Sequence, residues 1–174
     1  MEIRVSVSGV DRLIFKLKAY QKTLKNKQKI LLDKLAEIGI DVATVRFQTA
    51  QYDGENDVLV EKTPQWSGDN KLIISATGKS ITFIEFGTGV HYAEQHPKAM
   101  EFGAVRGEFG QGKGSQDSWG YYGVPGTNGR VIKTNEKGTL VVTHGNPPAR
   151  AMYDAGKEMR SRIVEIAREV FGND

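Results

Sequence analysis

Residues 83–92, FIEFGTGVHY, place the carboxylate of Glu85 inside an apolar run that ends on Gly87 and Gly89. A carboxylate among large apolar side chains is a candidate catalytic acid, but such a site needs a second convergent acid or base. The sequence marks no such partner. We therefore expect Glu85 to be solvated at a strand end, hydrogen-bonded to backbone amides, or paired with a cation, because a buried and unpaired carboxylate is costly.

Two glycine-containing stretches have some features of phosphate-binding loops. In GEFGQGKGS, residues 107–115, Gly114 separates Lys113 from Ser115, whereas a nucleotide-binding loop needs the hydroxyl residue directly after the lysine. The Gly-Thr-Gly of residues 87–89 has no further glycine at the dinucleotide-binding spacing, and no helix is expected to begin there. We expect neither stretch to bind a nucleotide, and we expect no cofactor.

The chain has three histidines, His91, His96 and His144. His91 and His96 together with Glu94 offer ligand atoms for zinc, but their spacing fits no helical zinc-protease motif and their segment is a predicted loop. No G-x-S-x-G pattern is present for a serine nucleophile. We expect neither a metal site nor a catalytic residue, and a hydrolase that uses Glu85 or the histidines stays a lesser alternative.

The composition narrows the class of protein. The chain has 174 residues and no cysteine, so disulfides and thiolate metal sites are excluded. No apolar run approaches the ~20 residues of a membrane-spanning helix, and the N-terminal MEIRVSVSG alternates instead of forming a signal-peptide block. We expect one domain over residues 1–174 in an intracellular or virion protein, with no membrane partner.

The positive charge is concentrated at the N-terminal end. Residues 1–34 hold nine Lys or Arg and three acids, whereas the remainder holds fifteen and eighteen. A basic helix can contact DNA or an acidic protein, but more often its lysines only solvate one face, and we favour that interpretation. The lysines concerned are Lys16, Lys18, Lys22, Lys25, Lys27 and Lys29.

The periodicity of apolar residues predicts the elements. Alternation at residues 3–7 predicts a short strand that Gly9 ends. Helical spacing over residues 10–24 and again over 31–45 predicts two helices, or one long bent helix, and the spacing over 152–170 predicts a final helix.

Several short strands are predicted between these helices. They are DVLVE, KLIISA and SITFIEF, the last two expected to pair across residues 77–79, and the hairpin RVIKT–TLVVT at residues 130–143. The resulting fold class is α+β, with a mainly antiparallel sheet packed against a long N-terminal helix or helix pair and a C-terminal helix.

A long glycine-rich and aromatic segment interrupts this order at about residues 90–129. Eleven of the twenty glycines lie in residues 87–129, and connections longer than ~15 residues are uncommon inside a compact domain. We interpret the segment as an inserted loop that becomes an assembly arm, ordered by neighbouring subunits. Its contact residues would be Trp119, Tyr121 and Tyr122.

Three features of the chain resemble one protein family. They are the opening strand and glycine before a lysine-rich helix, the FIEFGTG of residues 83–89, and the GNPPARAMYDAG of residues 145–156. Together they resemble the small head-tail joining or tail-completion proteins (minor tail or neck proteins) of long-tailed bacteriophages and prophages. The matching residues are Ile84, Glu85, Phe86, Gly87, Thr88 and Gly89 in the first motif and Pro148, Ala149 and Arg150 in the second.

The chain also departs from that family. TAQYDGENDVL stands where an Ala-Pro-Val-Asp-Thr-Gly-like run is usual, Ala151-Met152 replaces Pro-Phe, and the segment of residues 90–129 is unusually long. The resemblance implies that the hydrophobic-Glu-Phe-Gly-Thr motif ends a sheet strand and that the Pro-Ala-Arg motif starts the C-terminal helix. We expect Glu85 and Arg150 to form an ion pair there, within one subunit or across two.

The resemblance implies a non-enzymatic structural virion protein. Such proteins form a ring, commonly a hexamer, at the joint between head and tail. Its partners would be further copies of itself, a head-closure or connector protein, and a tail terminator or tail-tube protein. Genomic double-stranded DNA would pass through the ring, and assembly would take place in the host cytoplasm. A DNA-binding protein that uses the basic helices remains the main alternative.

Overall fold

The computed structural model describes residues 7–62, 71–106 and 116–172. It has the predicted α+β fold, with long helices at both ends of the described chain and two small antiparallel sheets between them. No helix among these residues combines the length and apolar character needed to cross a membrane.

Helix α1, Val7–Gln48, is one continuous helix rather than two. The polar residues 25–29, KNKQK, contain neither glycine nor proline, so nothing in them breaks the helix. At 1.5 Å per residue its 42 residues extend about 60 Å. The predicted opening strand lies mostly outside the described residues, but Val7 and Gly9 belong to α1, so the prediction that Gly9 ends a strand is wrong.

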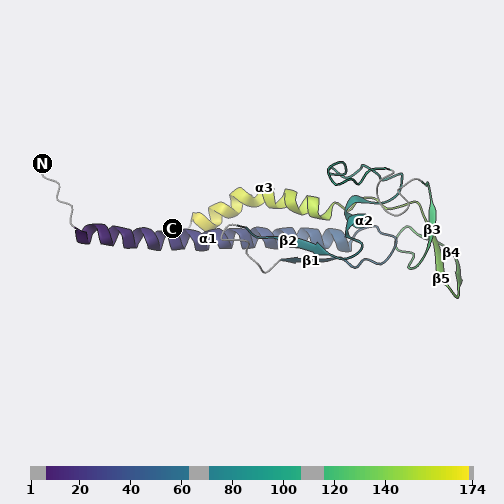
Figure 1. The fold of residues 1–174 in the computed structure, drawn as a ribbon, viewed down its shortest axis with the longest axis horizontal. Helices are drawn as coiled ribbons and strands as arrows, with labels where there is room; N and C mark the ends of the chain where they lie inside the picture. The colour runs from purple at the N-terminus through teal and green to yellow at the C-terminus, as the bar shows by residue number, and fades with distance from the viewer. Residues whose placement is uncertain (1–6, 63–70, 107–115, 173–174) are drawn as a thin grey trace.

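Helix α3, Ala151–Phe171, confirms the predicted C-terminal helix and packs on the second half of α1 (Figure 1). The two helices run antiparallel, because the start of α3 lies in a cluster with the end of α1 while its end lies beside Leu35. Gly39 allows close contact, since a Cβ there would lie 2.6 Å from the Sδ of Met159. The buried members of the two clusters are Ala43, Phe47, Ile84, Ala151 and Ala155, and Leu35, Ile166 and Val170.

Two sheets complete the fold. Strands β1, Leu59–Lys62, and β2, Ile74–Thr77, pair antiparallel and contact α1. The second sheet has the order β3-β5-β4, with β3 at Trp119–Tyr122, β4 at Arg130–Asn135 and β5 at Gly138–Thr143. The predicted β4–β5 hairpin is confirmed, and Figure 1 shows this sheet beyond the C-terminal end of α1.

The segment SITFIEF is a helix, so the prediction of a strand there is wrong. Helix α2 covers Ile81–Phe86. The carboxylate of Asp57 accepts hydrogen bonds from the backbone N–H groups of Lys79 (2.7 Å) and Ser80 (3.0 Å), and the Ser80 carbonyl accepts one from Ile84 N–H (3.0 Å). The two tertiary hydrogen bonds to Asp57 start a helical turn despite the β-branched and aromatic composition of the segment.

Candidate functional site

Glu85 lies at the end of α2 and directly faces the start of α3. It is only 5% exposed. Its Oε2 accepts the backbone N–H of Met152 at 2.9 Å, and its Oε1 accepts that of Tyr153 at 3.1 Å. Of the environments expected from the sequence, hydrogen bonding to backbone amides is therefore the one confirmed.

This carboxylate caps α3 from outside the helix. Arg150, at the N-cap position, has φ 55° and makes no side-chain capping bond. The first N–H groups of a helix have no partner within the helix, and the helix dipole favours a negative charge near them. Glu85 supplies both the acceptors and the charge, so its role in this geometry is to fix the start of α3.

His96 is a second buried polar residue and lies beside Glu85; we call the two residues the Glu85 cluster. Its Nε2 lies 3.2 Å from Glu85 Oε1, and its Nδ1 accepts the backbone N–H of Lys98 at 3.0 Å. Because Nδ1 accepts, Nε2 carries the hydrogen and donates it to the carboxylate. The side chain of His96 is 2% exposed, and its ring makes an edge contact with Phe86, with ring centroids 4.4 Å apart.

The two family-like motifs lie side by side. Thr88 N–H donates to the Asn146 carbonyl at 2.8 Å, and Asn146 N–H donates back to the Thr88 carbonyl at 3.2 Å. Gly87 has φ 79°, and a Cβ on it would lie 2.7 Å from the Asn146 carbonyl oxygen and 2.8 Å from Pro148 N. Glycine is needed here for its positive φ and for this close approach.

Arg150 does not pair with Glu85 through its side chain, so the predicted ion pair within the chain is wrong. Its guanidinium donates to the Gln95 carbonyl at 2.9 Å. Its backbone N–H donates to the carbonyl of Glu85 at 3.2 Å, and Ala149 N–H donates to that of Ile84 at 2.8 Å. The motifs meet as predicted, but through main-chain bonds and at the end of a helix rather than of a strand.

The aromatic residues assigned to an assembly arm belong to a strand. Trp119 and Tyr121 are half-buried in β3, which pairs with β5, and Tyr122 is 48% exposed. The hydroxyl of Tyr121 donates to the Val124 carbonyl at 2.7 Å, and burial raises the pKa of this phenol. The described part of residues 90–129 is thus folded onto its own chain, while its part in assembly stays a prediction.

Asp53 is a buried polar residue that sequence reasoning missed. Its carboxylate accepts Asn128 N–H at 2.6 Å and the hydroxyl of Thr143 at 2.5 Å, which ties the three-stranded sheet to the residues after α1. In the sequence it stands in YDGEND, a typical turn cluster, and no local signal distinguishes it from a solvent-exposed turn residue.

The first half of α1 carries an exposed apolar face, which we call the N-terminal stripe. It consists of Val10, Leu13, Leu17, Tyr20 and Leu24, which are between 38% and 59% exposed. Their spacing of three or four residues continues the face that α3 covers further along at Leu31, Leu35 and Ile38. Nothing in the described ranges covers the stripe, and Figure 1 shows this half of α1 extending beyond the end of α3.

The lysines that the sequence analysis named as possible contacts also lie in the N-terminal part of α1. Lys18, Lys22, Lys25 and Lys29 follow one another at helical spacing along a different side of α1, and all four are exposed. Lys16 is exposed and Lys27 is half-buried. The apolar stripe and the lysines therefore give two chemically different surfaces on one projecting helix.

Comparisons of this chain with models of protein families, with curated proteins and with solved structures give no match.

Proposed function

We propose that the chain is a non-enzymatic assembly subunit at the head-tail joint of a long-tailed bacteriophage. Copies of it form a ring there, and a hexamer is the size that the resemblance implies. The observation that supports this most is the N-terminal stripe. Fully burying a side chain such as Leu or Val is favourable by about 1.5–3 kcal/mol, so covering the exposed parts of five such residues contributes on the order of 5 kcal/mol per copy. That is comparable with the entire stability of a small domain.

The contact between the two motifs also supports the proposal. Residues 84–89 and 148–150 carry the resemblance to neck proteins, and their backbones hydrogen-bond to one another. They therefore act as one structural unit that sets the direction of α3 along α1. Glu85 has a capping role in that unit, which is the role of an architectural residue rather than of a catalytic acid.

A second surface of the chain suits the stripe of a neighbouring copy. An apolar groove of about 330 Å³ lies between α1, β2 and α3. In the proposed ring the stripe of each copy occupies the groove of the next, because a head-to-tail contact between two different surfaces generates a ring when its rotation closes. The residues that line the groove include Leu35, Leu72, Ile74, Met159 and Ile163.

The remaining partners follow from the same resemblance. A head-closure or connector protein and a tail terminator or tail-tube protein would bind the two sides of the ring, and genomic DNA would pass through it. Lysines on α1 face solvent or the DNA in such a ring. The protein would reside in the virion and would assemble in the host cytoplasm.

The test is the mass of the purified protein by light scattering across a concentration range. Wild type should form a discrete closed oligomer, and a variant with Leu13, Leu17 and Leu24 changed to Gln should remain a folded monomer. A matched control with Lys16, Lys18 and Lys22 changed to Gln should assemble as the wild type does. A wild type that stays monomeric at high concentration and with the cognate neck proteins present would contradict the proposal.

Mixing two defective variants distinguishes a head-to-tail ring from a symmetric dimer. The stripe variant keeps an intact groove, and Ile163→Gln alters the groove while keeping an intact stripe. Ile163 is 42% exposed, so its substitution should leave the fold intact. The mixture should form heterodimers and no closed ring, since only one productive contact remains.

A further inference from the structure

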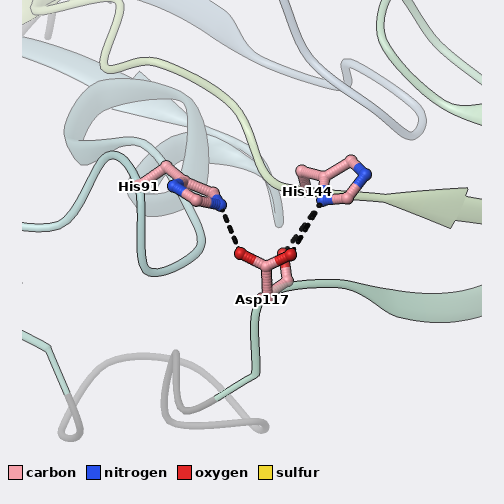
Figure 2. A group of neighbouring side chains, drawn as sticks. All are labelled: His91, Asp117 and His144. Atoms are coloured by element: carbon pink, nitrogen blue, oxygen red, sulfur yellow. Dashed lines mark hydrogen bonds and ion pairs between the residues drawn. The ribbon is translucent and has the colours of Figure 1, made fainter.

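A second cluster of titratable side chains lies away from Glu85. His91, Asp117 and His144 point toward one another from three segments (Figure 2). His91 Nε2 lies 2.6 Å from Asp117 Oδ1, and His144 Nδ1 lies 3.1 Å from the Asp117 carbonyl oxygen and 3.6 Å from its Oδ2. One ligand atom from each residue lies within 4.8 Å of the others. We propose that these three residues bind a divalent transition-metal ion of the Zn²⁺ class, a site independent of the proposed ring function.

The ligand set selects the class of ion. Two imidazoles and one carboxylate suit Zn²⁺ and its neighbours in the first transition series, whereas Mg²⁺ and Ca²⁺ prefer shells made of oxygen. Two ligands on one tetrahedral zinc, each at about 2.1 Å, are ~3.4 Å apart. His91 Nε2 and Asp117 Oδ1 are closer than this, at 2.6 Å, and His144 Nδ1 and Asp117 Oδ2 are near it, at 3.6 Å. All three ligand atoms lie within 4.8 Å of one another, so side-chain rotations that separate the first pair can place the three ligands around one ion.

The backbone around His91 is held in place. The N–H of Ala93 donates to the Gly89 carbonyl at 3.1 Å and closes a turn that contains His91. The side-chain amide of Gln95 donates to the carbonyl of His91 at 2.8 Å. A ligand whose backbone is already fixed loses less conformational freedom when it binds an ion.

The other two ligands are held together by the sheet. Asp117 stands two residues before Trp119, and His144 directly follows Thr143. Trp119 and Thr143 are paired partners at the ends of β3 and β5. The pairing of these strands therefore brings Asp117 and His144 together, although they are 27 residues apart in the sequence.

The site is open to solvent. The side chains of His91, Asp117 and His144 are 53%, 70% and 66% exposed. Three protein ligands leave at least one position for water on a tetrahedral ion, and exposure allows the ion to enter and leave. On binding, His91 and His144 take the tautomers that carry hydrogen on the ring nitrogen away from Asp117, and His144 gives up its hydrogen bond to the Asp117 carbonyl. The ion then links the turn after α2 to the start of β3 and the end of β5.

The test is titration of tag-free protein with ZnCl₂ by calorimetry, with CoCl₂ as a spectroscopic probe and MgCl₂ as the hard-ion control. We expect one Zn²⁺ per chain, visible absorption from tetrahedral Co²⁺, and no Mg²⁺ binding at the same concentrations. The variants His91→Gln, Asp117→Asn and His144→Gln should each weaken Zn²⁺ binding by at least about tenfold, because even the loss of a second-shell partner costs that much. Circular dichroism checks that each variant is folded.

His96 supplies an internal control. The chain has three histidines, so the His91→Gln and His144→Gln variants assign two of the imidazole signals in an NMR spectrum and the remaining signal belongs to His96. Zn²⁺ should shift the signals of His91 and His144 and leave that of the buried His96 unchanged. Saturation only at millimolar Zn²⁺, one ion shared by two chains with a doubled mass, or undiminished binding in the His91→Gln/His144→Gln variant would each overturn the proposal.

Discussion

Glu85 does for α3 what a local capping residue does in most helices. A helix start is usually satisfied by Ser, Thr, Asp or Asn at the N-cap, but here that position is Arg150 in a left-handed conformation. The acceptor comes instead from a residue 67 positions earlier than Met152. The start of α3 therefore depends on the tertiary fold, which places the buried carboxylate of Glu85 against it.

Substitution of Glu85 tests this dependence. Glu85→Gln replaces an acceptor oxygen by an N–H₂ group that faces helix N–H donors, so the free energy of unfolding should fall by at least ~2 kcal/mol. Glu101→Gln, which only breaks an exposed pair with Lys98, should cost no more than about 1 kcal/mol. Both values are measured by urea unfolding.

A double-mutant cycle identifies the partner of Glu85. The double variant Glu85→Gln/His96→Gln should lose less unfolding free energy than the sum of the two single variants, because the two side chains are in contact. The combination of Glu85→Gln with Arg150→Gln should be additive. The reverse result would restore Arg150 as the cation that pairs with Glu85.

Asp57 gives a prediction on pH. The pKa of its carboxyl is lowered because the backbone N–H groups of Lys79 and Ser80 donate to it. Such a group favours the folded state above its unfolded pKa, and this contribution is lost as the pH falls through the folded pKa. We expect Asp57→Asn to be less stable than wild type near pH 7 and the difference to shrink below about pH 4, measured by urea unfolding across pH. A difference that stays constant would show that Asp57 does not favour the start of α2 through its charge.

At the scale of elements, α1 uses one apolar face in two ways. Leu35 and Leu17 lie on the same face, but Leu35 is 9% exposed under α3 whereas Leu17 is 57% exposed. Leu35→Ala should therefore cost about 2–5 kcal/mol of monomer stability, the usual range for a buried leucine. Leu17→Ala should change it by less than ~0.5 kcal/mol. Thermal unfolding of dilute protein measures both, and an equal loss in the two variants would show that the stripe is covered within the monomer.

The elements that local pattern determines were predictable, and those that distant contacts determine were not. α3 and the β4–β5 hairpin follow from helical spacing and turn chemistry close at hand. The segment 81–86 has strand-like residues but is helical, because the residues just before it are held by distant contacts. The backbone N–H groups of Lys79 and Ser80 donate to the Asp57 carboxylate, and the Ser80 hydroxyl donates to the Glu55 carbonyl. Strand β3 and its pairing with β5 were not predicted, because the glycine-rich residues around Trp119 give no periodic signal for a strand.

The candidate sites also divide into those that a contiguous sequence motif reveals and those that only the fold brings together. The motifs of residues 84–89 and 148–150 were found because each is contiguous in the sequence. From the sequence, His96 is a candidate metal ligand with His91 or a member of a hydrolase site, but in the structure it donates to Glu85 whereas His91 contacts Asp117. His91 instead joins Asp117 and His144, residues that no local spacing relates to it.

At the scale of the whole molecule, α1 joins two regions of different character (Figure 1). One end packs against α3, the β1–β2 sheet and Ile84 of α2. At the other end the helix projects alone, and an isolated helix of about 15 residues is only marginally stable in water. The first half of α1 should therefore exchange its amide hydrogens far faster than the second half in the free subunit.

Assembly should remove this difference. If a neighbouring copy covers the N-terminal stripe, the amides of residues 10–26 should become strongly protected in the closed oligomer, while those of residues 35–47 should be protected in both states. Hydrogen exchange followed by mass spectrometry, on dilute monomer and on purified oligomer, measures the two segments in the same sample. The stripe variant with Leu13, Leu17 and Leu24 changed to Gln is the control, and its residues 10–26 should exchange rapidly at every concentration. Slow exchange of residues 10–26 in dilute wild type would mean that the helix is stable without a partner, and the stripe would then lose its role as the surface that drives assembly.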